Sequence, residues 1–234
     1  MLINQLKNIF REKHSPLEGD APSEQAISSG LEQTIAPQRK VLNVGGNSKD
    51  IAIPPEYHGW RHELLDIDAR GNPDIVCDAR ELTRLVEGYY DSVYCSHNLE
   101  HYYSHEVAKV LSGFRHVLKE DGFVYIRVPD MGELMRRVVS GQMDIDDMLY
   151  VSAAGPIHVV DVIYGYRVEI ERSGNAFFAH KTGFTQKSLV ARLKASGFPY
   201  VASWCGDLEI GAIASKNALS TYAVELFNMQ TVSE

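Results

Sequence analysis

A glycine pair and a distant acid form the first group of residues whose spacing suits chemistry. Gly45 and Gly46 follow the apolar run 41–44, and Asp66 comes 21 residues after Gly45 (66 − 45). An acid about 20 residues after such a turn can accept hydrogen bonds from the vicinal hydroxyls of a ribose. Asp68 could do the same from further along the chain, and we favour Asp66. Either acid could instead be a solvated strand end.

Two histidines form the second group. His97 and His101 follow the compact apolar run 91–96. A free imidazole titrates near pH 6.5, so a histidine at this point could take a proton from a substrate at neutral pH. The alternative is a structural histidine that bonds a neighbouring side chain or a backbone carbonyl. His105 and His116 fall within a predicted helix, and we expect no catalytic role for them.

The turn differs from the G-x-G-x-x-G pattern of dinucleotide-binding proteins. Gly45 and Gly46 are followed by Asn47, Ser48 and Lys49. Asparagine tolerates the left-handed conformation, so the turn can still be tight at Asn47. The glycine-rich cradle for phosphates is missing, however. A nucleoside without phosphates therefore fits the turn better than a dinucleotide.

Strands that alternate with helices must position these residues. Apolar periodicity predicts helices at 105–120, with Gly122 as its stop, at 131–139, and at 185–195, with Thr185 as a possible cap. This alternation indicates an α/β fold in which ligands bind outside the carboxyl ends of the strands. The predicted strands are 41–44, 63–68, 74–78, 91–96, 123–128, 200–204 and 209–214.

The order and spacing of several short motifs resemble the class I S-adenosylmethionine-dependent methyltransferases, in particular their type-11-like group. The resemblance covers roughly residues 39–130, with a weaker echo at 180–184 and 196–198. Asn43 stands where the family usually has an acid, only the first of three glycines is in register, and Glu120-Asp121 replaces the common Pro-Gly. The motifs are NVGGNSK (43–49), DID (66–68), VCDAREL (76–82), YDSVYCSHNLEH (90–101) and LSGFRHVLKEDGF (111–123).

This resemblance implies a Rossmann-like, seven-stranded, mostly parallel sheet sandwiched by helices, with S-adenosylmethionine as cofactor. The sulfonium of that cofactor already activates the methyl group, so the protein must align the acceptor and remove its proton. We expect His101 and His97 to be catalytic and the acceptor to be a small molecule methylated at oxygen. The expected cofactor-binding residues are Asn43, Gly45, Gly46, Asp66, Asp78, Ala79 and Ser96.

Two other functions remain open from the sequence. One is a non-catalytic nucleoside-binding protein of the same fold, in which the altered first motif marks lost turnover. The other is a nicotinamide-dependent reductase or epimerase, which the missing third glycine and the Asp78-Ala79 motif disfavour.

The predicted organisation has three parts. Residues 1–38 read as an N-terminal helix and a polar linker, 39–218 as the methyltransferase-like domain, and 219–234 as a tail with a possible short helix. An insertion at about 131–182 follows the fifth strand and so lies over the ligand end of the sheet. Its candidates for substrate contact, each also open to a purely structural role, are His158, Tyr164, Arg167 and His180.

Composition excludes several classes of protein. The formal charge is −8, from 23 basic and 31 acidic residues, and no basic run favours nucleic acid. Cys77, Cys95 and Cys205 lack the paired spacing of a zinc site or a disulfide framework, so we expect no metal and a reducing cytoplasm. Since no apolar run reaches the roughly 18 residues of a membrane span, we expect a soluble protein. The acceptor and the oligomeric state stay open.

Overall fold

The computed structural model describes residues 38–152 and 154–227. The predicted N-terminal helix lies outside the described residues, as does the linker except for its last residue. Part of the predicted C-terminal tail is described, and it contains helix α6, Thr221–Leu226.

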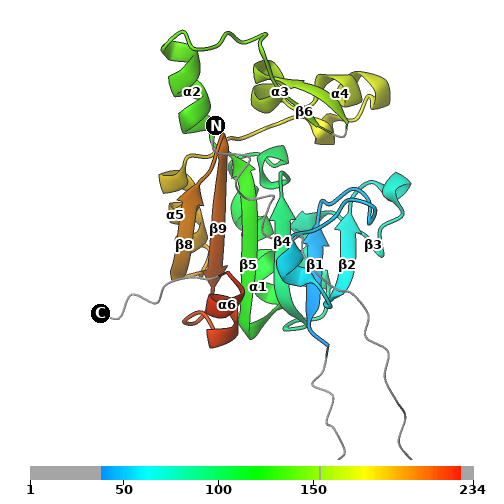
Figure 1. Cartoon of the computed structure of the whole chain (residues 1–234). Coiled ribbons are helices and arrows are strands. Elements are labelled where there is room, and N and C mark those ends of the chain that lie inside the picture. Colours follow the sequence, from blue (N-terminus) through cyan, green and yellow to red (C-terminus); the bar gives the residue numbers. More distant parts are fainter. Residues whose placement is uncertain (1–37, 153, 228–234) are drawn as a thin grey trace, which may run out of the picture. The chain divides into compact units, whose positions relative to one another are not determined.

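A seven-stranded sheet in the order β3-β2-β1-β4-β5-β9-β8 organises the fold (Figure 1). Strands β1 to β5 pair in parallel, whereas β9 is antiparallel to β5 and β8 is antiparallel to β9. The predicted fold class, a Rossmann-like, mostly parallel α/β sheet, is confirmed. The strands are β1 (Lys40–Val44), β2 (Arg61–Asp66), β3 (Ile75–Val76), β4 (Tyr90–Ser96), β5 (Leu118–Pro129), β8 (Tyr200–Cys205) and β9 (Glu209–Ser215).

Each face of the sheet has its own hydrophobic core, because side chains alternate along every strand. On one face, Leu42 and Val93 pack with helices α1 (Val107–Val117) and α5 (Gln186–Ala195) and with the 3-10 helix η3 (Ala79–Arg84). On the other face, Val41 and Tyr94 pack with Tyr57 and with Ala223 of α6. The sheet is therefore covered on both sides.

Helix α1 forms because its apolar residues recur on one stripe. Val107, Val110, Leu111 and Phe114 are all fully buried, and this spacing suits a helix packed on a sheet. The predicted end of this helix at Gly122 is wrong. The helix ends at Val117, because Leu118 already pairs with Tyr90 as the start of β5. Gly122 lies within β5, where a Cβ atom would come within 3.0 Å of the Asp91 carbonyl oxygen.

The chain between β5 and α5 builds a separate layer beyond the carboxyl ends of the strands (Figure 1). Thr185 caps α5, as the sequence predicts. Within the described part of the chain, no helix has the length and apolar character needed to cross a membrane. The layer contains α2 (Met131–Val139), the hairpin of β6 (Met148–Ser152) and β7 (Gly155–His158), α3 (Val159–Tyr164), α4 (Arg167–Ser173) and the 3-10 helix η5 (Ala176–Phe178).

Asp161 joins the start of α3 to the start of α4 within this layer. Its carboxylate accepts hydrogen bonds from the backbone amide of His158 at 2.9 Å and from Arg167, through the amide at 3.2 Å and Nε at 2.8 Å. Burial raises the pKa of the Asp161 carboxyl, but these donors outweigh burial and hold that pKa below its usual value. The stabilisation is therefore present above the ordinary aspartate pKa and is lost as the pH falls through the lowered value.

We expect Asp161→Ala to loosen residues 155–170, which form one part of this layer. The change leaves two part-buried backbone donors without their partner, at a cost of about 1 kcal/mol. Hydrogen exchange should become faster in this segment and stay unchanged in β1 and β4. The matched control is Asp146→Ala, which removes an exposed carboxylate from the same region. Equal exchange in the two variants would contradict this role for Asp161.

Candidate active site

The turn after β1 requires glycine at its first position. Gly45 has φ +74°, and a Cβ atom there would lie 2.0 Å from Asn98 Nδ2. At Gly46 a Cβ atom would lie 2.2 Å from Nδ2 of the buried Asn43. Two asparagine side chains therefore pack against the turn and leave no room for larger residues.

Asp66 closes this turn from the neighbouring strand. Its Oδ2 accepts the amide hydrogen of Asn47 at 2.9 Å, and its Oδ1 accepts that of Asp68 at 2.9 Å. Asn47 has φ +61°, the left-handed conformation expected from the sequence. A carboxylate offers about four acceptor sites, so Asp66 can still accept hydrogen bonds from a ribose diol. The carboxylate of Asp68 is instead paired with Arg70, with Oδ2 and Nη2 2.5 Å apart.

Asp78 occupies the equivalent place after β3. Its carboxylate accepts the amide hydrogen of Arg80 at 2.9 Å and also pairs with the Arg80 guanidinium. Burial raises the pKa of the Asp78 carboxyl, but the bonds from Arg80 outweigh it and lower that pKa. Asp78 is thus an anionic acceptor at neutral pH.

Gly45, Asp66 and Asp78 line a small cavity of about 110 Å³ at the carboxyl edge of the sheet. Phe177 and Phe178 of the overlying layer close it. The other predicted cofactor residues line neither this cavity nor its larger neighbour. Asn43 and Ala79 are buried, Gly46 lies against the Asn43 side chain, and Ser96 ends β4 without lining either cavity.

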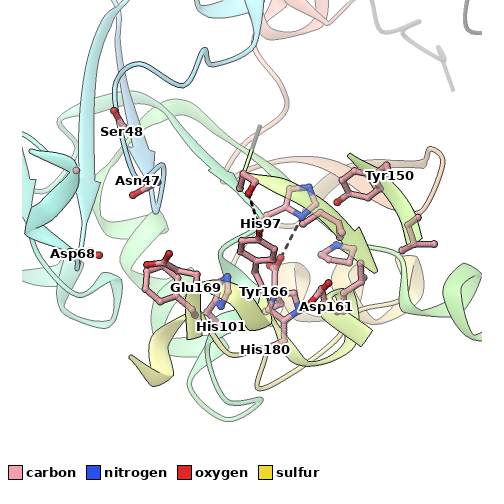
Figure 2. A pocket seen from close by; sticks show the side chains of 18 of the residues that line it. Asn47, Ser48, Asp68, His97, His101, Tyr150, Asp161, Tyr166, Glu169 and His180 are labelled. Carbon is pink, nitrogen blue, oxygen red and sulfur yellow. Dashed lines mark hydrogen bonds and ion pairs between the residues drawn. The ribbon is translucent and has the colours of Figure 1, made fainter. Parts of the chain in front are cut away.

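A larger cavity of about 1350 Å³ adjoins the small one, between the strand ends and the overlying layer (Figure 2). His97 and His101 line both cavities. Of the four predicted substrate contacts, only His180 lines the large cavity. His158 and Arg167 bond Asp161, and Tyr164 is 60 % exposed.

His97 is held between two carboxylates. Its Nε2 lies 3.0 Å from Glu209 Oε2, and its Nδ1 lies 3.5 Å from Glu100 Oε1. Partial burial lowers the pKa of His97, but the two carboxylates outweigh it and raise the pKa to about 9. An imidazole that is protonated at neutral pH cannot accept a proton. The backbone of His97 is also left-handed, with φ +49°.

His101 has the opposite character. Burial lowers the pKa of His101, so its ring is neutral at pH 7. Its Nδ1 donates a hydrogen bond to the carbonyl oxygen of Ala179 at 3.2 Å. The proton is therefore on Nδ1, and the lone pair on Nε2 is available. His101, rather than His97, is the histidine at this edge that can act as a base.

Sequence reasoning missed Glu100 and Glu209. Glu100 is 1 % exposed, and neither of its carboxylate oxygens has a hydrogen-bond partner among the described residues. Its position between His97 and His101 in the sequence could have indicated it, because an acid so close to two histidines can pair with either of them. Glu209 gave no signal, because its pairing with His97 and Arg127 depends on the antiparallel addition of β9.

Comparisons with known proteins bear on the domain and its fold. Residues 61–126 match the family model described as a methyltransferase domain, a stretch that runs from β2 into β5 and begins after the glycine turn. No curated protein matches the sequence.

Solved structures share the fold at low sequence identity. A SAM-dependent methyltransferase from Archaeoglobus fulgidus is 16% identical with a TM-score of 0.50, and the alignment covers 76% of this chain and 86% of that one. A protein from Pyrococcus horikoshii OT3 is 16% identical with a TM-score of 0.48, over 77% and 84% of the two chains. The predicted resemblance to class I methyltransferases is confirmed: a methyltransferase-domain model matches part of the sequence, and the chain shares its fold with a SAM-dependent methyltransferase.

We expect Gly45→Ala to be more harmful than Gly59→Ala. Both glycines have positive φ, +74° and +82°, so both substitutions carry a strain of about 1–2 kcal/mol. Only Gly45 meets another side chain, and overpacking adds about 1–3 kcal/mol. Urea unfolding of the two variants measures the difference. Equal losses of stability would show that Asn98 yields without cost.

Proposed function

We propose that this protein transfers the methyl group of S-adenosylmethionine to an oxygen of a small-molecule acceptor. The observation that carries the proposal is the pair of adjoining cavities that share His97 and His101. One cavity has acceptors suited to a nucleoside, and the other has room for a second molecule. His101 stands where the two meet.

The residues present fit the cofactor. S-adenosylmethionine, when bound, supplies a methyl group that is already activated. Asp66 and Asp78 are suited to hydrogen-bond hydroxyl and amino groups of a nucleoside, and the turn lacks a phosphate cradle, which this cofactor does not need. A cavity of about 110 Å³ is smaller than the roughly 300 Å³ at which small-molecule sites begin. We infer that Phe177 and Phe178 move outward when the cofactor enters.

The large cavity suits a hydroxylated or cationic acceptor. Its two arginines, Arg70 and Arg172, are outnumbered by carboxylates, which disfavours an acidic substrate and the phosphates of a nucleic acid. The three cysteines are free thiols, which supports the predicted cytoplasmic location. The carboxylates that line the cavity are Asp50, Asp68, Glu100, Asp161, Glu169, Asp207 and Glu209.

Methylation of a hydroxyl group requires removal of its proton as the oxygen attacks. His101 Nε2 can take that proton, because the Ala179 carbonyl holds the other ring nitrogen as the donor. Alignment of acceptor and methyl group comes from the walls of the two cavities.

Titration calorimetry with S-adenosylhomocysteine tests the cofactor, with NAD as the parallel ligand. We expect micromolar binding of the former and none of the latter. Asp66→Ala should weaken this binding by about 1–3 kcal/mol, because a buried charged acceptor is lost. The matched control is Asp74→Ala. Like Asp66, Asp74 accepts a backbone amide hydrogen, here from Leu64 of β2. Unlike Asp66, it lines neither cavity. Binding of NAD alone, or equal affinity in wild type and Asp66→Ala, would refute these assignments.

Replacement of His101 tests its role as the base that removes the acceptor proton. His101→Ala should lower turnover by about 100-fold or more, the usual scale of proton-transfer catalysis. The affinity for S-adenosylhomocysteine should change far less. Turnover is measured with labelled methyl on an acceptor found by a metabolite screen, and exposed His58→Ala is the control. Unchanged turnover in His101→Ala would remove this residue from the reaction.

A further inference from the structure

Three side chains from distant parts of the chain meet on the wall of the large cavity. Glu100 and His101 follow β4, whereas His180 comes from the layer beyond the sheet. One potential ligand atom from each lies within 4.8 Å of the others. Figure 2 shows His101 and His180 next to one another, and their ring centroids are 4.8 Å apart. Two histidines and one carboxylate are a donor set typical of transition-metal sites.

Glu100 is a buried carboxylate whose charge faces His97 but whose oxygens lack hydrogen bonds. It is 1 % exposed, and neither oxygen has a hydrogen-bond partner among the described residues. Its ion pair with His97 Nδ1 is 3.5 Å long, beyond the usual range of a hydrogen bond. A carboxylate buried without hydrogen bonds is costly, and coordination to a metal ion is one of the few ways to compensate it. The contact with His97 involves Oε1, which leaves Oε2 available.

Both histidines are oriented as metal ligands usually are. His101 Nδ1 donates to the Ala179 carbonyl at 3.2 Å, and His180 Nδ1 donates to the Val162 carbonyl at 2.8 Å. A ligating histidine usually donates its other ring N–H to a carbonyl or carboxylate, which sets the tautomer and the ring orientation. In this arrangement Nε2 of each ring carries the free lone pair.

We propose that Glu100, His101 and His180 bind one divalent first-row transition-metal ion. Ligands at about 2.1 Å from a tetrahedral ion lie roughly 3.4 Å apart, so ligand atoms within 4.8 Å of one another need to approach by at most about 1.4 Å. Three protein ligands leave at least one coordination position open, and the cluster lines the cavity assigned to the acceptor. The ion is therefore placed to bind an acceptor oxygen.

The role of the ion rests on the proposed function, although its binding does not. An acceptor hydroxyl that coordinates a divalent ion has a lowered pKa and loses its proton near neutral pH. The oxygen then attacks the methyl carbon, the carbon–sulfur bond breaks, and its electron pair stays on sulfur. The released proton passes to solvent. In this state His101 is a ligand, and the ion replaces it as the activating group.

Cobalt binding to the full-length chain tests the site directly. The protein is treated with a chelator, separated from it, and titrated with Co²⁺ while the visible ligand-field absorption is followed. We expect one equivalent to bind. His101→Gln and His180→Gln should weaken binding at least about 10 to 100-fold, the effect already seen for the outer partners of metal ligands. His58→Gln, an exposed histidine outside the cluster, should bind as wild type does.

Two further measurements separate a lost site from a lost fold. Circular dichroism checks that each variant is folded, and Zn²⁺ should raise the melting temperature of wild type and His58→Gln but not of His180→Gln. If no Co²⁺ binds to the wild type, or if the His180→Gln variant binds it equally well, the proposed site is wrong. Calorimetry with S-adenosylhomocysteine is run on the metal-free protein. Metal binding without cofactor binding would refute the proposed function and leave the metal site standing. Cofactor binding without metal binding would refute the metal site and leave the proposed function standing.

Discussion

The candidate site depends on two backbone hydrogen bonds to one carbonyl group. The carbonyl oxygen of Glu100 accepts the amide hydrogens of Lys181 at 2.7 Å and Thr182 at 3.2 Å. These bonds join the turn after β4 to the end of the overlying layer. Because His101 and His180 are the neighbours of the joined residues, the same bonds bring the two imidazole rings together. The hydrogen bond from His101 Nδ1 to the Ala179 carbonyl joins the same two segments.

A second junction is weaker and lies beside the small cavity. Arg70 pairs with Asp68 at the end of the sheet and with Glu169 of α4 in the overlying layer. Its guanidinium lies 5.7 Å from the Phe178 ring centre. Arg70 is half exposed, and exposed pairs contribute only about 0–1 kcal/mol. The contacts of the layer beside Asp68 are therefore more exposed than the backbone bonds to Glu100 beside His101.

The altered glycine turn is accommodated by its neighbours. In place of further glycines, Asn43 and Asn98 pack under the turn, and Asp66 bonds its amide at Asn47. The match to the methyltransferase-domain model begins only at residue 61, after this turn. The turn at residues 45–47, which departs from the expected glycine-rich motif, is therefore supported by the side chains around it.

The sequence by itself determined the parallel sheet, because buried strands and amphipathic helices leave periodic apolar patterns. It also placed Gly45, Asp66, Asp78 and His101 at the carboxyl edge, since each ends or follows a strand. It could not find the limits of α1, because strand pairing of Leu118 overrode the helical pattern. Only the tertiary structure decided which polar residues of the long layer face the cavity, since that segment has no simple period. It turned His158 and Arg167 toward Asp161, paired His97 with Glu209, and set His180 beside Glu100. The contacts of His97 and His180 join residues far apart in the chain, so spacing along the sequence carries no record of them. Those of Asp161 are local, but they depend on how α3 and α4 are oriented.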